Sequence, residues 1–175
     1  MKAKRRLLMV LVVMCGSVAH LTAEVQIDLG LNVPYYVGIT TEDDDLDAAL
    51  DWLFLLPDAK VAWFHAVKPV RLGGGLRLWT LVLQSVVYPT LAVEADAGPF
   101  VLNAGAGGGM FLFFGLYSGL QTAGVFVPDL SVGYRFTESF SLGAGAAFLF
   151  APEVADLSSF GYMGTLFARY TIKPF

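Results

Sequence analysis

The chain has 175 residues with a formal net charge of −4, and 56% of them are hydrophobic against 15% charged. This composition, with a mean hydropathy of +0.64, is too apolar for an ordinary soluble domain, and the 14% of aromatic residues excludes an intrinsically disordered chain. The excess of acidic over basic residues excludes the basic surface with which proteins bind nucleic acid.

Residues 1–23 have the pattern of an export signal. The segment begins with four basic side chains, Lys2, Lys4, Arg5 and Arg6. An apolar run from Leu7 to Met14 follows, and then small residues. Cleavage is expected after Ala23, where a strand pattern begins, and Ala19 offers a second site. A chain cleaved at either site lacks Cys15 and forms no disulfide. The alternative interpretation makes Cys15 the first residue of a lipoprotein.

From residue 24 onward, hydrophobic residues recur at every second position. In the segment 24–38 one face carries Val25, Ile27, Leu29 and Leu31, and the other face carries Gln26, Asp28 and Asn32. This period of two predicts a β-strand with one apolar face. The stretch 100–127 has no charged residue and is long enough for a membrane helix, but the repeated alternation favours strands.

The connection over residues 39–57 is acidic and contains no Lys or Arg. Its acids are Glu42, Asp43, Asp44, Asp45, Asp47 and Asp51. Thr40 followed by Leu46, Ala49, Leu50 and Leu53 predicts a short capped helix at the mouth of the fold. Asp43, Asp45 and Asp47 have the first spacings of a calcium loop, but Ala48 and Phe54 stand where that loop needs Gly and Glu. We therefore expect a solvated acidic rim.

Seven further strands are predicted, and they repeat as hairpins. They cover residues 58–67, 70–83, 89–97, 100–114, 122–136, 140–150 and 160–173, and the hairpin at 89–106 aligns with the one at 128–146. Strands with a lipid-compatible face satisfy their backbone groups in a membrane only by closing into a barrel. The predicted fold is therefore all-β: a transmembrane antiparallel up-and-down β-barrel of eight strands over residues 24–175. The short turns at 68–69, 98–99 and 137–139 face the periplasm, and loops at 39–57, 84–88, 115–121 and 151–159 lie outside.

The hairpin at residues 133–145, Gly-Tyr-Arg-Phe-Thr-Glu-Ser-Phe-Ser-Leu-Gly-Ala-Gly, and the terminal Phe175 resemble the small eight-stranded outer-membrane barrels of the OmpA/OmpX type and the OmpW-like proteins. The resemblance implies a location in the outer membrane after export and signal-peptide cleavage, and contact with outer-membrane lipid. It also implies insertion by machinery that reads the C-terminal aromatic pattern, here Tyr170, Ile172 and Phe175. Because Phe175 falls on the opposite face from the other two, a bulge near Pro174 is expected.

The interior of an eight-stranded barrel is just wide enough to be filled by side chains. Alternation directs seven charged residues inward: Asp28, Arg71, Arg77, Glu94, Asp96, Arg135 and Arg169. Since buried charges persist only when they are paired, we predict a ladder of carboxylate–guanidinium pairs that closes the periplasmic half of the lumen. A gated polar path is the second interpretation of the same residues.

Towards the outer end the inward positions become apolar. These positions are Trp79, Leu81, Phe111, Phe113, Val125, Val127 and Leu149. They predict a hydrophobic pocket with a closed floor, and the OmpW-like resemblance implies that its ligand moves sideways through the wall. The alternative is that these strands lie deeper in lipid or pack against one another.

No catalytic residue, metal site or cofactor is predicted, because His65 is the only histidine after residue 23 and no motif places a serine beside it. The expected function is that of a monomeric outer-membrane barrel, porin-like in fold, which binds or passively admits small hydrophobic molecules. The alternative is a structural or adhesion protein that acts through the acidic segment 39–57.

Overall fold

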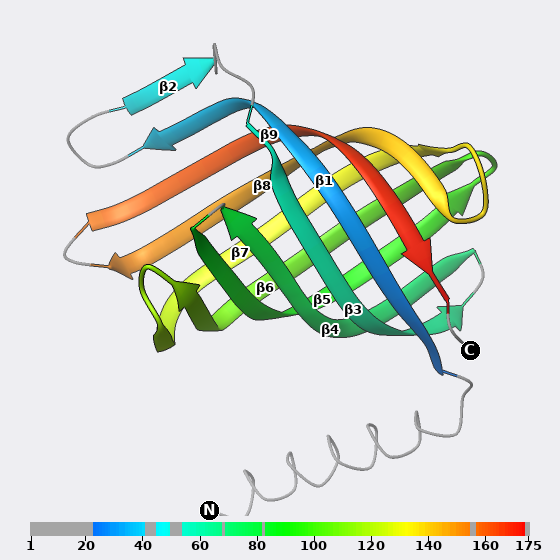
Figure 1. The fold of residues 1–175 in the computed structure, drawn as a ribbon, viewed down its shortest axis with the longest axis horizontal. Coiled ribbons are helices and arrows are strands. Elements are labelled where there is room, and N and C mark those ends of the chain that lie inside the picture. Colours follow the sequence, from blue (N-terminus) through cyan, green and yellow to red (C-terminus); the bar gives the residue numbers. More distant parts are fainter. Residues whose placement is uncertain are drawn as a thin grey trace, which may run out of the picture.

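The computed structural model describes residues 23–40, 45–49, 54–67, 69–81, 83–154 and 157–173. These residues form nine strands (Figure 1). In chain order the strands are β1 (Ala23–Thr40), β2 (Asp45–Ala49), β3 (Leu56–Val67), β4 (Val70–Leu81), β5 (Gln84–Ala97), β6 (Phe100–Gly115), β7 (Gly119–Arg135), β8 (Phe140–Val154) and β9 (Leu157–Ile172).

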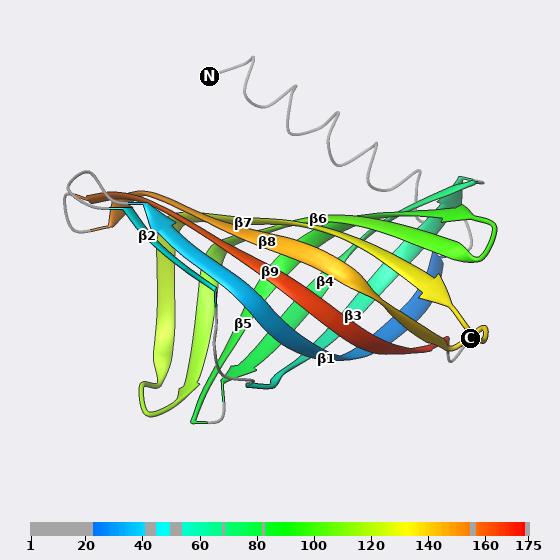
Figure 2. The ribbon, with the colours of Figure 1, turned by 90° about the horizontal axis from the view of Figure 1, so that it is seen from above.

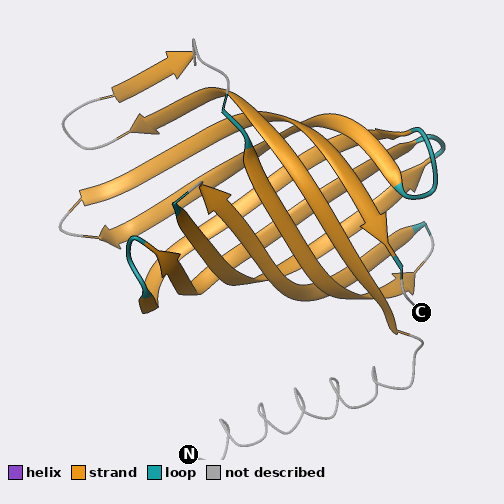
Figure 3. Ribbon diagram, viewed as in Figure 1, coloured by secondary structure: helices purple, strands orange, loops and turns teal. Residues whose placement is uncertain are grey.

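Eight of the strands close into an antiparallel up-and-down barrel, as the alternation predicted. The order β1-β3-β4-β5-β6-β7-β8-β9 is completed by pairing of β9 with β1, and the short β2 lies outside this ring (Figure 3). No helix in the described part of the chain has the length and hydrophobicity needed to cross a membrane. The start of β1 and the end of β9 lie at one end of the barrel, the terminal end, and the opposite end is called the outer end (Figure 1).

The strands are strongly tilted. Following ladder partners around the barrel from Val37 returns to β1 at Glu24, by way of Met163, Ala147, Asp129, Gly105, Ala92, Gly73 and Phe64. Such a stagger is the condition for closing a sheet into a barrel. Each step along this path, from β9 to β8, β7 and β6, therefore moves towards the terminal end. A residue on β6 or β7 lies nearer that end than the residues on β8 and β9 that the same path crosses.

The connections at the outer end differ from the prediction. The segments 84–88, 115–121 and 151–159, expected as loops, are mostly strand, and the connections shrink to residues 82–83, 116–118 and 155–156. The prediction was wrong because polar, glycine and proline residues interrupt the alternation in these segments, while pairing with the neighbouring strands keeps them extended. At the terminal end, the short turns at Gly98–Pro99 and 137–139 agree with the prediction.

The helix predicted after Thr40 is also wrong, because residues 45–49 form β2. Its ladder with β1 runs from Thr40↔Asp45 to Tyr36↔Ala49, whereas β3 begins to pair with β1 only at Asn32. On the edge of β1 that faces β3, the last residues of β1 thus have no partner in β3. Pairing of residues 45–49 with this free edge outweighs their local preference for a helix. The acids Glu42, Asp43, Asp44 and Asp51 lie outside the described residues, as do Pro174 and Phe175.

Aromatic side chains gather on the outward face near both ends. Near the terminal end, ring centroids are 5.5 Å apart for Phe100 and Tyr134 and 4.9 Å apart for Tyr134 and Phe136. Towards the outer end, Phe160 lies 4.8 Å from Phe150 and 5.7 Å from Tyr162. Exposed leucines lie between, among them Leu72, Leu76, Leu91, Leu130, Leu142 and Leu166. Two aromatic belts with an apolar band between them are typical of membrane barrels.

Candidate functional site

The lumen near the terminal end holds a cluster of ion pairs. Arg71 pairs with Glu94, and its guanidinium also lies 3.5 Å from the carboxylate of Glu24. Arg135 donates to Asp96 over 2.7 Å. The Arg71–Glu94 pair is buried, whereas the side chains of Arg135 and Asp96 are 29% and 45% exposed. The first pair is therefore shielded from water and the second is screened by it.

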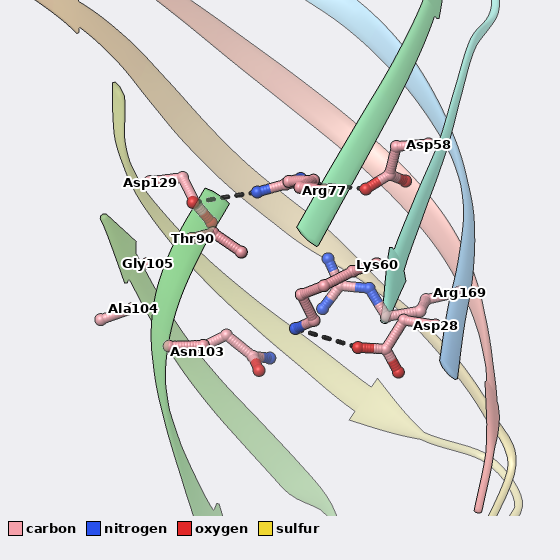
Figure 4. A pocket seen from close by; sticks show the side chains of 11 residues that line it. Asp28, Asp58, Lys60, Arg77, Thr90, Asn103, Ala104, Gly105, Asp129 and Arg169 are labelled. Atoms are coloured by element: carbon pink, nitrogen blue, oxygen red, sulfur yellow. Dashed lines mark hydrogen bonds and ion pairs between the residues drawn. The ribbon is translucent and has the colours of Figure 1, made fainter. Parts of the chain in front are cut away.

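The next level of the lumen is built around Asp28 and Lys60. The Lys60 ammonium lies 2.9 Å from Asp28 Oδ2, and both side chains are buried (Figure 4). Gln26 and Thr171 donate hydrogen bonds to the same carboxylate over 2.9 and 2.8 Å. The carboxylate thus has several donors, which is the condition for keeping a charge in the interior.

A third level lies towards the outer end, where Arg77 bridges two carboxylates. Its guanidinium is 3.1 Å from Asp58 and 2.9 Å from Asp129 (Figure 4). Two glycines make room for the acids: a Cβ on Gly30 would lie 1.8 Å from Asp58 Oδ1, and one on Gly105 would lie 2.3 Å from Asp129 Oδ2. Glycine at these inward positions is therefore a packing requirement of the charge network.

Of the seven charged residues predicted to face inward, six take part in these ion pairs: Asp28, Arg71, Arg77, Glu94, Asp96 and Arg135. Arg169 is buried on the same inner face, but no carboxylate among the described residues lies within ion-pair distance of it. Its guanidinium instead lies 4.6 Å from the centroid of the Phe167 ring. The cation that pairs with Asp28 is Lys60 and not an arginine.

Sequence reasoning missed five charged members of the network: Glu24, Asp58, Lys60, Asp129 and Lys173. The period-two signal was available, since Asp58 and Lys60 share one face of β3 with Ala62 and Phe64, and Asp129 has the same parity on β7 as Arg135. The whole set, called the ionic plug below, contains six acids and six bases: Glu24, Asp28, Asp58, Glu94, Asp96 and Asp129, with Lys60, Arg71, Arg77, Arg135, Arg169 and Lys173.

Small voids remain among the described residues of the ionic plug. Three cavities of about 10, 20 and 20 Å³ lie among its residues, and Arg169 borders all three. A volume of this size holds about one water molecule. The charged part of the lumen is thus filled by side chains, with Phe64 packed over Gly73 and Phe167 over Gly143.

Above the ionic plug, towards the outer end, aromatic side chains line the inner face. Trp79 Nε1 donates to the Tyr88 hydroxyl over 2.9 Å, and the Tyr88 ring lies 5.6 Å from Phe111. Phe111 in turn is 6.4 Å from Phe113, which is 5.7 Å from Tyr117. We call Trp79, Tyr88, Phe111, Phe113 and Tyr117 the aromatic row. Arg77 lies 4.6 Å from the Trp79 ring, so the row begins directly on the ionic plug.

The structure thus brings together Trp79, Phe111 and Phe113 of the predicted pocket, and it adds Tyr88, which the sequence placed in a loop. Val125 and Val127 are half-buried, while Leu149 is 44% exposed and lies against Gly161 on the neighbouring strand. The side chain of Leu81 is outside the described part. Of the predicted insertion signal, Tyr170 and Ile172 are exposed on the outward face, and Phe175 is not described.

Comparisons with known proteins support the fold. No protein-family model matches the chain, and no curated protein matches it significantly. The crystal structure of Neisserial surface protein A (NspA) is similar at 13% identity with a TM-score of 0.53, covering 87% of this chain and 99% of that one. The N-terminal β-barrel domain of Pseudomonas aeruginosa OprF matches at 11% identity and a TM-score of 0.46, over 86% of this chain and 100% of that one. The outer-membrane enzyme PagL matches at 16% identity and a TM-score of 0.42, over 82% and 98%. Together with the closed ring of eight strands, the similarity to NspA shows that the chain has the fold of the small eight-stranded outer-membrane β-barrels.

Proposed function

We propose that the protein is a monomeric, non-enzymatic outer-membrane barrel that binds or passively admits small hydrophobic molecules through its outer lumen. The observation that carries this proposal is the position of the aromatic row directly above a filled ionic plug. A molecule that enters from the outer end meets apolar rings and then a floor of paired charges. Such a lumen favours apolar ligands, because each carboxylate of the floor already has a cationic partner and a polar ligand gains little there.

The pairing of β7 with β8 supports a sideways route for such a ligand. The ladder between them ends at Phe126↔Phe150, although β7 begins at Gly119 and β8 continues to Val154. Within the described segments no ladder pair joins these outer halves, and the β6–β7 hairpin turns away from β8 (Figure 2). We therefore place the ligand's route between lipid and lumen at this seam, on the outer side of the plug.

The proposal is tested by fluorescent hydrophobic dye binding to the protein refolded in detergent micelles. The triple variant Trp79→Ser, Phe111→Ser, Phe113→Ser is expected to lose binding. A matched control replaces three exposed aromatic residues that lie away from the lumen: Phe100→Ser, Phe114→Ser and Phe136→Ser. Heat-modifiable gel migration shows whether each variant is folded. Unchanged dye binding in a folded lumen variant, or equal losses in both variants, would refute the proposal.

A second candidate function is adhesion through the acidic segment 39–57. The observation that favours it is β2, which pairs with β1 on one side and has no ladder partner on its other side among the described strands. A free strand edge is a template for an extended partner. Replacing residues 41–53 by a short Gly-Ser turn is expected to abolish surface adhesion while leaving dye binding intact. Loss of dye binding with retained adhesion would exclude this second role.

A further inference from the structure

The wall of the barrel contains a break in strand pairing that crosses β5, β6 and β7. The β5–β6 ladder shifts register between Val87 and Thr90, and the β6–β7 ladder shifts between Gly108 and Met110. Among the described strands, Gly109 has no ladder partner on either side, and neither do residues 123–125 of β7. The backbone groups of these residues are therefore outside the regular network that satisfies the rest of the wall.

The sequence builds this break locally. Gly108 and Gly109 have φ values of 125° and 79°, which residues with a side chain rarely adopt. A Cβ on Gly108 would lie 2.3 Å from the carbonyl oxygen of Val125. Pro89 and Pro128 flank the break on the neighbouring strands, and each lacks the N–H that would extend a ladder.

A hollow of about 600 Å³ lies on the outward face at this break. Its apolar walls come from Leu91, which is 69% exposed, from Phe126 and from Ala106. Phe126 is the ladder partner of Phe150 in the outer aromatic belt. Because the tilt places β6 and β7 nearer the terminal end than β8, the hollow lies at the depth of the apolar band rather than beyond the belt.

Hydrocarbon offers no hydrogen bonds, so backbone groups that no ladder pairs at this depth favour a partner that carries a polar group into the apolar band. We propose that the hollow binds the acyl chain of a membrane lipid that bears a hydroxyl group on that chain. The chain lies against Leu91, Ala106 and Phe126, and the hydroxyl bonds to the backbone near Gly109 and Gly124. A hydroxyl suits this site because it both donates and accepts and fits where glycine leaves no side chain.

A second hollow on the same face supplies an internal comparison. It measures about 450 Å³ and lies between Val93, Leu102, Ala104, Leu130 and Ala144. Its ladders are continuous, with Ala104 paired to Leu130 and Val132 paired to Ala144. The strand ladders are therefore interrupted beneath the first hollow and continuous beneath the second. Only the first hollow is expected to distinguish a hydroxylated acyl chain from a plain one.

The test is native mass spectrometry of the refolded full chain in nanodiscs that contain equal amounts of two phosphatidylethanolamines, one with 3-hydroxytetradecanoyl and one with tetradecanoyl chains. The wild type is expected to retain the hydroxylated lipid several-fold more, the discrimination that an added hydrogen bond provides. Ala106→Phe fills the first hollow and is expected to remove this preference. Ala104→Phe, two residues away on the same face of the same strand, is expected to keep it.

Equal retention of the two lipids by the wild type, or the same preference in both variants, would overturn the proposal. Hydrogen exchange on the wild type gives an independent measurement that needs no variant to fold. The amides of Gly109 and Gly124 are expected to exchange more slowly in nanodiscs with the hydroxylated lipid than in nanodiscs with the plain lipid. Fast exchange in both would show that water occupies the hollow, which would also overturn it.

Discussion

Removal of Arg77 is the sharpest test of the ionic plug. Arg77 is the one cation within ion-pair distance of both Asp58 and Asp129 in the described lumen, at 3.1 and 2.9 Å, and all three side chains are at least 85% buried. In Arg77→Met, Asp58 keeps the hydrogen bond of 2.9 Å from Asn32, but both carboxylates lose their counter-charge. Breaking a buried pair from one side costs about 3–5 kcal/mol. We expect a loss of about this size in the free energy of unfolding.

The assay is urea unfolding of the protein refolded in lipid vesicles, followed by tryptophan fluorescence and by heat-modifiable migration. The triple variant Arg77→Met, Asp58→Asn, Asp129→Asn is expected to recover most of the loss, because it leaves no unpaired charge. Arg135→Met serves as the control, since its partner Asp96 is 45% exposed, and is expected to cost less than about 1 kcal/mol. The reasoning is refuted if Arg77→Met costs no more than Arg135→Met, or if the triple variant is no more stable than Arg77→Met alone.

Three further predictions are tested in the same assay. Gly73→Ala is expected to destabilise by about 1–3 kcal/mol, because its Cβ would lie 2.6 Å from a buried ring, whereas Gly161→Ala, with 3.6 Å of space, is expected to be tolerated; equal effects would contradict this account of the inward glycines. Arg169→Met is expected to leave stability unchanged or raised, since no described carboxylate pairs with it; a loss like that of Arg77→Met would show that Arg169 has an essential partner. Tyr88→Phe removes the acceptor of Trp79 Nε1 and is expected to cost about 1 kcal/mol; no measurable loss would mean that this hydrogen bond does not hold the aromatic row.

Part of the candidate site was readable because the direction of a side chain in a strand depends on parity alone. Asp28, Arg77 and Glu94 alternate with apolar neighbours, so their inward direction follows from residues beside them in sequence. Their partners could not be read in this way. Lys60 stands beside Asp28, and Asp129 beside Arg77, because tilt and register bring β3 to β1 and β7 across the lumen to β4.

The sequence by itself determined the class of fold and the number and order of the barrel strands, since period-two alternation is local and survives wherever one face is apolar and the other polar. Only the tertiary structure decided the outer end: the extended hairpins, β2 in place of a helix, Tyr88 in the aromatic row, and the break at Gly109. In those segments acidic, polar, proline or glycine residues interrupt the alternation, so no local pattern separates strand from loop. Pairing with distant strands, which satisfies the backbone in a closed barrel, makes that choice.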